Sequence, residues 1–183
     1  MSRVLVAYGT KHGATREIAE AIAEELRRAG HAADCIEADA ATGVDDYDAV
    51  VVGSAVYMKR WLSDARRFLK RNARALAARP LWIFSSGPCG EKPDPRWSEP
   101  GKIVAQAERL GAREHVVFGG RLPLEPANFM ERAMVNACPP EHRDLRDWEA
   151  IREWADAIAR ELDPGSLDRS NATVLGTRTR GER

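Results

Sequence analysis

One loop near the start of the chain carries the residue types that bind anions. Residues 7–15 read AYGTKHGAT and join an apolar segment, residues 4–7, to a stretch of helical periodicity that begins near Arg16. A helix N-terminus has unpaired backbone N–H groups and the positive end of the helix dipole, and glycine lets the backbone approach a ligand closely. The hydroxyls of Thr10 and Thr15 can add hydrogen bonds to phosphate oxygens. This combination predicts a phosphate site.

The loop matches neither of two common phosphate-binding patterns. The GxxxxGK[ST] pattern needs Lys and then Ser or Thr after its second glycine, and the GxGxxG pattern needs a third glycine. Gly9 and Gly13 meet neither condition. The spacing therefore indicates a monophosphate cradle of a different kind.

Strands and helices alternate along the chain and must position this loop. Continuous apolar runs such as AVVVG and LWIFSS are typical of strands in a parallel sheet that is covered on both faces. Alternation of five such strands with helices predicts an α/β, doubly wound, five-stranded parallel sheet in three αβα layers. Right-handed crossovers favour the strand order 2-1-3-4-5. The predicted strands are residues 4–8, 33–37, 49–53, 81–85 and 115–118.

Four amphipathic segments are predicted as helices. The first is stopped by Gly30, the second ends before Pro80, the third covers about residues 100–110, and the last covers 148–162. The inward faces are predicted to hold Ile18, Ile22, Leu26 and Ala29 in the first helix, Trp61, Ala65, Phe68, Leu69 and Leu76 in the second, and Trp148, Ile151, Ala155, Ile158 and Leu162 in the last.

Two further loops are expected beside the phosphate loop. In such sheets ligands bind at the carboxyl ends of the strands, next to the point where the strand order reverses, here between the first and third strands. The loop after the third strand reads GSAVYM at 53–58, and the loop after the fourth reads SSGPCG at 85–90. Backbone amides and carbonyls of such small-residue loops can hold a flat heterocycle, with Tyr57 placed to stack on it or to close its edge.

Composition sets the broad class of the protein. A length of 183 residues suits one domain, and 28 basic residues balance 28 acidic ones, which gives no electrostatic reason to expect nucleic acid as a partner. No apolar run reaches the roughly 20 residues of a membrane span, and the start shows no signal-peptide pattern. Three widely spaced cysteines suggest neither a disulfide framework nor a metal site. We expect a cytoplasmic protein without a transmembrane segment.

Two regions depart from the regular alternation. Residues 120–147 form an insertion before the last helix, with a short amphipathic piece around Phe129, Met130, Met134 and Val135. Residues 163–183 are polar and contain almost no apolar side chains, so we expect a disordered tail after a domain that covers 1–162.

The loop YGTKHGAT at 8–15 resembles the flavin mononucleotide (FMN) phosphate loop of the flavodoxin superfamily, and the element order over residues 3–162 agrees. Within that superfamily the chain is similar to the flavodoxin-like, menaquinone-dependent protoporphyrinogen dehydrogenases. The matching segments are GSAV at 53–56, FMERAM at 129–134 in the insertion, and DWE at 147–149, where the last helix opens. The resemblance implies a flavodoxin-like fold and an FMN-dependent oxidoreductase of heme biosynthesis that oxidises protoporphyrinogen IX.

The resemblance also assigns residues to the cofactor. The resemblance further implies that a quinone accepts the electrons, which would associate a cytoplasmic protein with a membrane. The sequence identifies no residue as general acid or base. Phosphate contacts would come from Thr10, Lys11, His12, Gly13, Ala14 and Thr15, and ring contacts from Ser54, Ala55, Val56 and Tyr57 on one side and Ser86, Gly87, Pro88, Cys89 and Gly90 on the other.

Several alternatives stay open at this point. Lys11 and His12 could be solvated loop residues, and Cys89 could be a nucleophile, although no partner histidine is evident and a small residue against the ring is the favoured interpretation. The insertion could be a substrate lid, a dimer contact or a surface filler. The alternative function is a flavodoxin-type carrier that shuttles electrons between protein partners, although such carriers are usually acidic and this chain has no net charge. The redox partner, a small molecule or a protein, and the oligomeric state stay undetermined.

Overall fold

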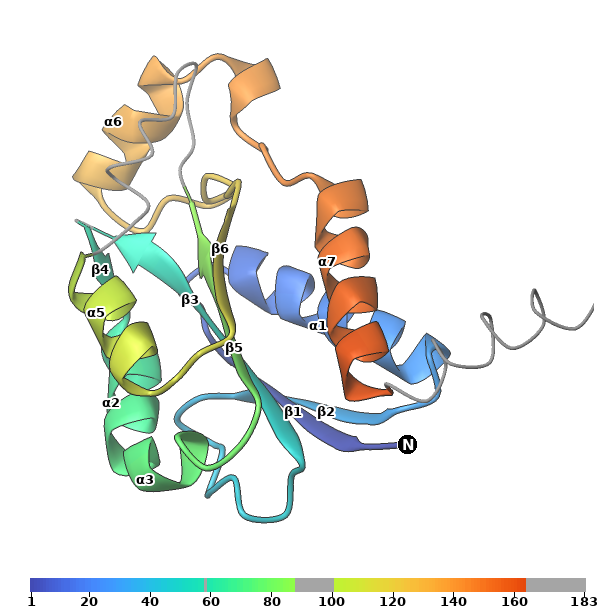
Figure 1. Ribbon diagram of the computed structural model, residues 1–183. Helices are drawn as coiled ribbons and strands as arrows, with labels where there is room; N and C mark the ends of the chain where they lie inside the picture. Colours follow the sequence, from blue (N-terminus) through green and yellow to red (C-terminus); the bar gives the residue numbers. More distant parts are fainter. Residues whose placement is uncertain (58, 88–100, 164–183) are drawn as a thin grey trace, which may run out of the picture.

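A parallel sheet forms the middle of the molecule (Figure 1). The structure is a computed structural model and describes residues 1–57, 59–87 and 101–163. The sheet runs in the order β2-β1-β3-β5-β6, and a short strand, β4, pairs antiparallel with β3 outside this path. Without β4 the order is the predicted 2-1-3-4-5, so the doubly wound topology is confirmed. The strands are β1 (Arg3–Gly9), β2 (Ala32–Glu37), β3 (Ala49–Tyr57), β4 (Arg60–Trp61), β5 (Leu81–Ser86) and β6 (Glu114–Phe118).

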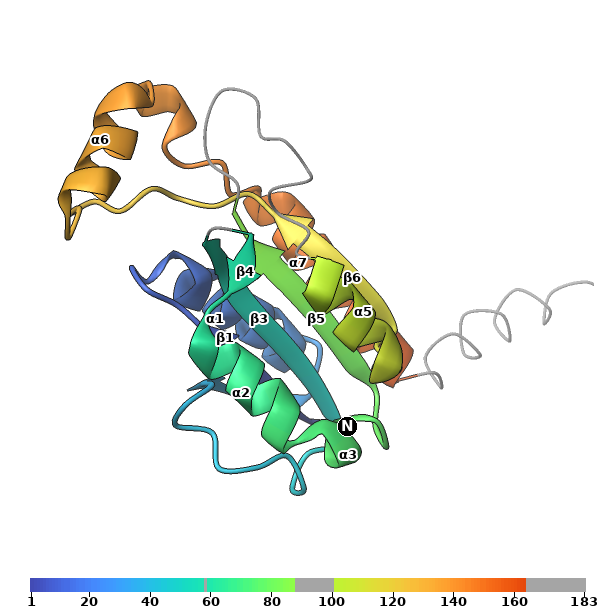
Figure 2. The same ribbon diagram turned by 90° about the vertical axis from the view of Figure 1, so that its left-hand side faces the viewer.

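Helices cover both faces of the sheet, which completes the three layers (Figure 2). One face packs against α1 (Ala14–Arg28) and α7 (Trp148–Leu162), and the other against α2 (Ser63–Arg71), α3 (Ala73–Leu76) and α5 (Gly101–Arg109). Adjacent residues of β1 serve opposite cores: Val4 and Val6 face α1, whereas Leu5 and Ala7 face α2. Burial on both faces explains why the strand segments are continuously apolar rather than alternating.

The predicted second helix is wrong in two places. Trp61 lies in β4 rather than in a helix, and the helical segment is interrupted at Asn72 between α2 and α3. The Asn72 side chain donates a hydrogen bond to the carbonyl of Phe68 at 3.0 Å, next to its own backbone N–H at 3.1 Å. Asparagine competes in this way for backbone acceptors and favours a helix end.

One inward-facing assignment, Ala29, is wrong, and one buried residue, Trp154, was not predicted, whereas Trp148 and Leu162 pack against the core as expected. Ala29 follows the end of α1 and is exposed, because the helix stops at Arg28. In α7, Trp154 is buried, whereas Trp148 and Leu162 are only half-buried. Trp154 packs edge-on against Phe84 and Phe118, and its indole N–H donates to Glu114 at 2.7 Å.

The insertion between β6 and α7 stands above the end of the sheet (Figure 1). It contains α6 (Phe129–Ala137) and a short 3-10 helix (Pro140–His142). Its two ends meet in a narrow neck, where Leu122 N donates to Arg143 O at 2.8 Å and Leu145 N donates to Gly120 O at 2.9 Å. We call these two paired segments, residues 119–122 and 143–146, the neck.

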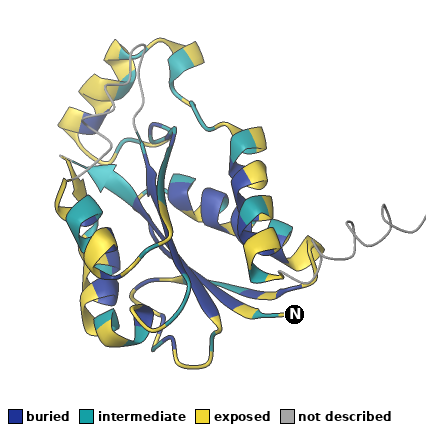
Figure 3. Cartoon of the chain, viewed as in Figure 1, coloured by how far each residue is buried: buried dark blue, intermediate teal, exposed yellow. Residues whose placement is uncertain are grey.

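Helix α6 exposes three of its large apolar side chains. Phe129, Met130 and Met134 are 87%, 67% and 53% exposed, while Glu131 on the same helix is buried (Figure 3). The short helix expected around these residues is present, but its most buried side chain is acidic, and of the four apolar residues named for it Val135 alone is half-buried.

Two expectations fall outside the described residues. The predicted tail beyond residue 163 and the end of the third predicted loop, Pro88, Cys89 and Gly90, belong to ranges that the structure does not describe. Among the described helices, none is long and apolar enough to cross a membrane.

Candidate functional site

The carboxyl ends of three neighbouring strands bring the predicted loops to one edge of the sheet. In the parallel register, Gly9 of β1 lies opposite Ser54 of β3, and Ser54 lies opposite Ser85 of β5. The next pair along β3 and β5 is Ala55 and Ser86. The segments that follow Gly9, Ser54 and Ser86 therefore start side by side, as the sequence predicted for a site at the reversal of strand order.

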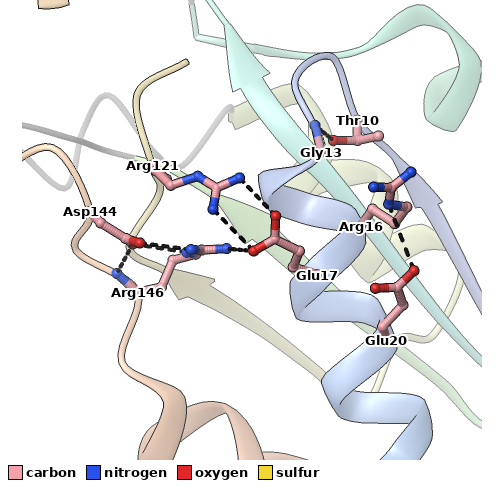
Figure 4. Close-up of polar contacts among 8 residues, drawn as sticks. All are labelled: Thr10, Gly13, Arg16, Glu17, Glu20, Arg121, Asp144 and Arg146. Atoms are coloured by element: carbon pink, nitrogen blue, oxygen red, sulfur yellow. Dashed lines mark hydrogen bonds and ion pairs between the residues drawn. The ribbon is translucent and has the colours of Figure 1, made fainter. Parts of the chain in front are cut away.

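The loop after β1 ends in an open helix N-terminus. Gly13 is the N-cap of α1 and adopts a left-handed conformation, φ 83°, which a residue with a side chain rarely takes. Thr10 Oγ1 accepts a hydrogen bond from Gly13 N at 3.0 Å (Figure 4). Gly13 has no side chain with which to cap α1, and within the described part of the chain no side-chain cap bond is present; Thr15 in the first turn is buried. The loop thus pairs uncapped helical N–H groups with threonine hydroxyls, the donor set that suits an anion.

Lys11 and His12 are engaged by the insertion. Lys11 Nζ lies 2.5 Å from Glu131 Oε1, and His12 Nε2 lies 3.0 Å from the same oxygen. The other carboxylate oxygen, Glu131 Oε2, accepts from the backbone N–H of Ala127 at 2.8 Å. Hydrogen bonds from Lys11, His12 and Ala127 lower the pKa of Glu131 to about 2, so it is ionised at neutral pH.

Glu131 is the site residue that the sequence interpretation missed. A local signal was present, because Asn128 and Glu131 have the spacing of a capping box, and Asn128 Oδ1 accepts from Glu131 N at 2.9 Å. That pattern predicts a helix start at residue 129. It does not reveal a partner 120 positions earlier in the chain.

The predicted loop at residues 53–58 is wrong, because β3 continues to Tyr57 and pairs there with β4 in a hairpin. Tyr57 pairs with Arg60 of β4, and Lys11 Nζ lies 5.3 Å from the centre of the Tyr57 ring. Ser54 is fully buried, accepts a hydrogen bond from Leu62 N at 3.1 Å and donates one to Ala55 O at 2.9 Å. Its hydroxyl holds the hairpin in place, so the half-buried residues Ala55, Val56 and Tyr57 are the ones placed to face a ligand.

The loop after β5 is described only at its start. Ser86 is buried, and Gly87 has φ 115° and donates its N–H to Phe118 O at 3.1 Å. This bond ties the loop to the end of β6. Pro88, Cys89 and Gly90, the remaining predicted ring contacts, lie outside the described residues.

One acidic side chain lies close to the open helix end, and two arginines neutralise it. Glu17 in the first turn of α1 lies 2.7 Å from Arg121 Nη2 and 2.7 Å from Arg146 Nη1, which come from the two sides of the neck (Figure 4). Burial raises the pKa of Glu17, but hydrogen bonds from Arg146 and Arg121 outweigh it and lower the pKa below its ordinary value. The two arginines thus neutralise the negative charge of Glu17.

Arg146 is itself held firmly. Its side chain is 4% exposed, it pairs with Asp144 Oδ2 at 2.7 Å, and its guanidinium lies 4.6 Å from the centre of the Trp148 ring. The hydrogen bond from Arg146 lowers the pKa of Asp144. The start of α1 thus has backbone N–H groups, threonine hydroxyls and a neutralised carboxylate beside the ends of β3 and β5.

Comparisons with known proteins agree with this geometry. A family model described as "Flavodoxin domain" matches residues 5–147. The chain is 30% identical to the Protoporphyrinogen IX dehydrogenase [quinone] of Escherichia coli strain K12, over 90% of this chain and 99% of that protein.

Solved structures show the same fold at lower identity. A flavodoxin from the domain Archaea aligns with a TM-score of 0.57 at 16% identity and covers 88% of this chain and 99% of its own. The rubredoxin oxygen:oxidoreductase of Desulfovibrio gigas aligns with a TM-score of 0.61 at 18% identity, over 88% of this chain and 36% of that one. At these identities the likeness concerns the fold.

Proposed function

Because the chain belongs to the flavodoxin domain family, we propose that it binds FMN and acts as an FMN-dependent oxidoreductase. The observation that carries this proposal is the open N-terminus of α1, which follows a left-handed Gly13 and has no side-chain cap. It lies at the edge of the sheet where three strands end side by side.

The residues present fit a phosphomonoester with a flat ring. Backbone N–H groups at the start of α1 and two threonine hydroxyls suit the phosphate, and the pairing of Glu17 with two arginines reduces the repulsion from that carboxylate. In the proposed assignment Thr10, Lys11, His12, Gly13, Ala14 and Thr15 hold the phosphate, Ala55, Val56 and Tyr57 line one side of the ring with the buried Ser54 behind them, and Ser86, Gly87, Pro88, Cys89 and Gly90 line the other.

The protein's own contribution is binding, orientation and access. Bound flavin would supply the chemistry, since its ring accepts a hydride or two electrons in turn. Backbone groups of the loops after β3 and β5 would orient the ring, and Tyr57 would cover it on one side. Because Ser54 is already satisfied by Leu62 and Ala55, its role is to keep the β3–β4 hairpin rigid.

Protoporphyrinogen IX is the substrate that we propose, with a quinone as acceptor. Support comes from the 30% identity to a protein named for that activity, which extends over almost the whole of that relative. The exposed apolar side chains of α6 support contact with a large apolar molecule beside the site. A quinone acceptor would bring a cytoplasmic protein to a membrane surface.

A flavodoxin-type electron carrier is the second candidate, and the structural similarity to flavodoxins favours it. The balanced charge of the chain argues against a carrier, because carriers find basic partners through an acidic surface. Anaerobic reduction separates the two. Reduction of the bound flavin by protoporphyrinogen IX, followed by reoxidation with a menaquinone analogue, would support the enzyme, whereas inertness toward both would favour the carrier.

Cofactor binding can be tested with one hydroxyl. Thr15→Ala is expected to weaken FMN binding by about 1–2 kcal/mol, the scale of one hydrogen bond to a charged group, and to leave riboflavin binding unchanged. Fluorescence titration gives both affinities. Thr42→Ala, at an exposed position away from the site, is the matched control. Failure of the wild-type protein to bind FMN would refute the proposed function, and equal losses for FMN and riboflavin would place the phosphate elsewhere.

A further inference from the structure

Glu131 is a buried carboxylate that joins the insertion to the predicted phosphate loop. Its side chain is 8% exposed, and its Oε1 atom receives both Lys11 Nζ at 2.5 Å and His12 Nε2 at 3.0 Å. Lys11 and His12 belong to the segment between β1 and α1, and Glu131 belongs to the first turn of α6. The contact spans the gap between the sheet edge and the insertion.

The polarity of α6 indicates that charge contributes strongly to its contact with the loop, because its most buried side chain is acidic. Phe129, Met130 and Met134 are exposed and Val135 is half-buried, whereas the acidic side chain of Glu131 is buried. Helices of globular proteins usually bury their apolar side and expose their charges. The docking of α6 therefore depends strongly on the two side chains, Lys11 and His12, that share one carboxylate oxygen.

A phosphate bound at the start of α1 would contact the same two side chains, Lys11 and His12. Lys11 and His12 immediately precede Gly13, the N-cap of that helix. Glu131 neutralises the charge of Lys11 and occupies one hydrogen-bonding position of His12. Its carboxylate therefore lowers the local positive potential and repels a phosphate group.

From this juxtaposition we propose that Glu131 competes with the phosphate group of the cofactor for Lys11 and His12, so that phosphate binding and the docking of α6 oppose each other. The inference rests on the proposed FMN site. Since α6 carries the exposed apolar residues, cofactor binding would loosen the element that is placed to meet an apolar substrate. Glu131 is in this sense a positioning residue, which acts through Lys11 and His12.

The variant Glu131→Gln tests the competition. Glutamine keeps an oxygen that can accept from Ala127 N and preserves the N3 position of the capping box, but it removes the negative charge. We expect FMN to bind about fivefold tighter, the scale of removing one charge near a phosphate dianion in a partly solvated site, with riboflavin unchanged. The matched control is Glu125→Gln, which removes the same charge from an exposed position of the insertion. It should leave the FMN to riboflavin ratio as in the wild type.

Hydrogen exchange gives a readout that does not depend on flavin. Inorganic phosphate, compared with chloride at equal ionic strength, should speed exchange of the α6 amides in the wild type. In Glu131→Gln these amides should already exchange faster in chloride than those of the wild type, and phosphate should change their exchange little.

The outcomes separate the two proposals. If the wild type binds FMN but Glu131→Gln binds it equally or more weakly, the competition is wrong while the FMN site stands. If the wild type binds no FMN, the proposed function fails, and exchange in phosphate decides the inference alone: faster exchange of α6 supports it, and unchanged exchange overturns it.

Discussion

Arg146 is expected to be the strongest single support of the insertion, and Arg146→Met tests this. Its guanidinium joins Glu17 of α1 to Asp144 of the neck through contacts of 2.7 Å on each side, and its Nε atom donates a further hydrogen bond to Asp144 at 2.8 Å. Methionine keeps an unbranched apolar stem of similar length but removes every charged contact, including the one between the guanidinium and the Trp148 ring. The substitution therefore isolates the electrostatic part of the neck.

The magnitude follows from the surroundings of the three charges. A hydrogen bond to a charged group contributes about 1.5–3 kcal/mol, and Arg146 makes several. The loss is smaller than their sum, because Glu17 and Asp144 are 36% and 43% exposed and regain water, and Glu17 keeps Arg121 at 2.7 Å. We expect a loss of about 2–3 kcal/mol in the free energy of unfolding, or about 4–12 °C in Tm for a domain of this size.

The assay is urea denaturation followed by circular dichroism, with Arg16→Met as the matched control. Arg16 Nε lies 3.7 Å from Glu20, and both side chains are more than half exposed (Figure 4). An exposed pair of this kind should contribute less than about 0.5 kcal/mol. Equal losses for the two variants would refute the reasoning, because the neck arginine would then act no differently from a surface charge.

The difference in stability between the wild type and Arg146→Met should also depend on pH. Folding lowers the pKa values of Glu17 and Asp144 from ordinary values of 4.5 and 3.8, so their contribution is complete above those values and is lost as the pH falls through the lowered ones. The stability gap between the wild type and Arg146→Met should therefore narrow from pH 6 toward pH 3. A gap that stays constant over this interval would contradict the assignment of the charges.

Two further predictions concern other parts of the fold. Burial raises the pKa of Cys35 to about 12, so its thiol should resist iodoacetamide at pH 8 in the folded protein and react after unfolding in urea, as measured by peptide mass spectrometry; rapid native labelling would contradict this. A Cβ atom at Gly119 would lie 1.8 Å from Leu145 O, so Gly119→Ala should cost more than about 2 kcal/mol in thermal unfolding. Gly43→Ala, where a Cβ would meet nothing within 4 Å, is the control, and a similar loss there would count against the packing argument.

The fold could be predicted because its signals are local. Buried strands such as residues 49–53 are continuously apolar, and α7 has the predicted bounds because Asp147 caps it by accepting from Glu149 N and Ala150 N. The break at Asn72 was missed because helical periodicity continues through it to Leu76, so the apolar pattern gives no sign of the interruption.

The site could be predicted only in part, for a related reason. The order of the strands places the three loops together, and the sequence gives that order. Side-chain partners across the site are tertiary, so neither the bond between Lys11 and Glu131 nor the pairing of Glu17 with Arg121 could be read from spacing. The hydroxyl of Ser54 shows the same limit, since its partner Leu62 becomes a neighbour only when the β3–β4 hairpin forms.

The insertion acts on the charge of the phosphate loop in two opposite ways. Arg121 and Arg146 of the neck neutralise Glu17 beside the start of α1, which favours an anion there, whereas Glu131 of α6 neutralises Lys11, which disfavours one. Arg146→Met and Glu131→Gln should therefore change the ratio of FMN to riboflavin affinity in opposite directions, downward for the first and upward for the second. Because riboflavin lacks the phosphate, a general loss of folding would weaken both ligands and leave the ratio unchanged. If both variants shift the ratio the same way, the two parts of the insertion do not act on the loop through charge.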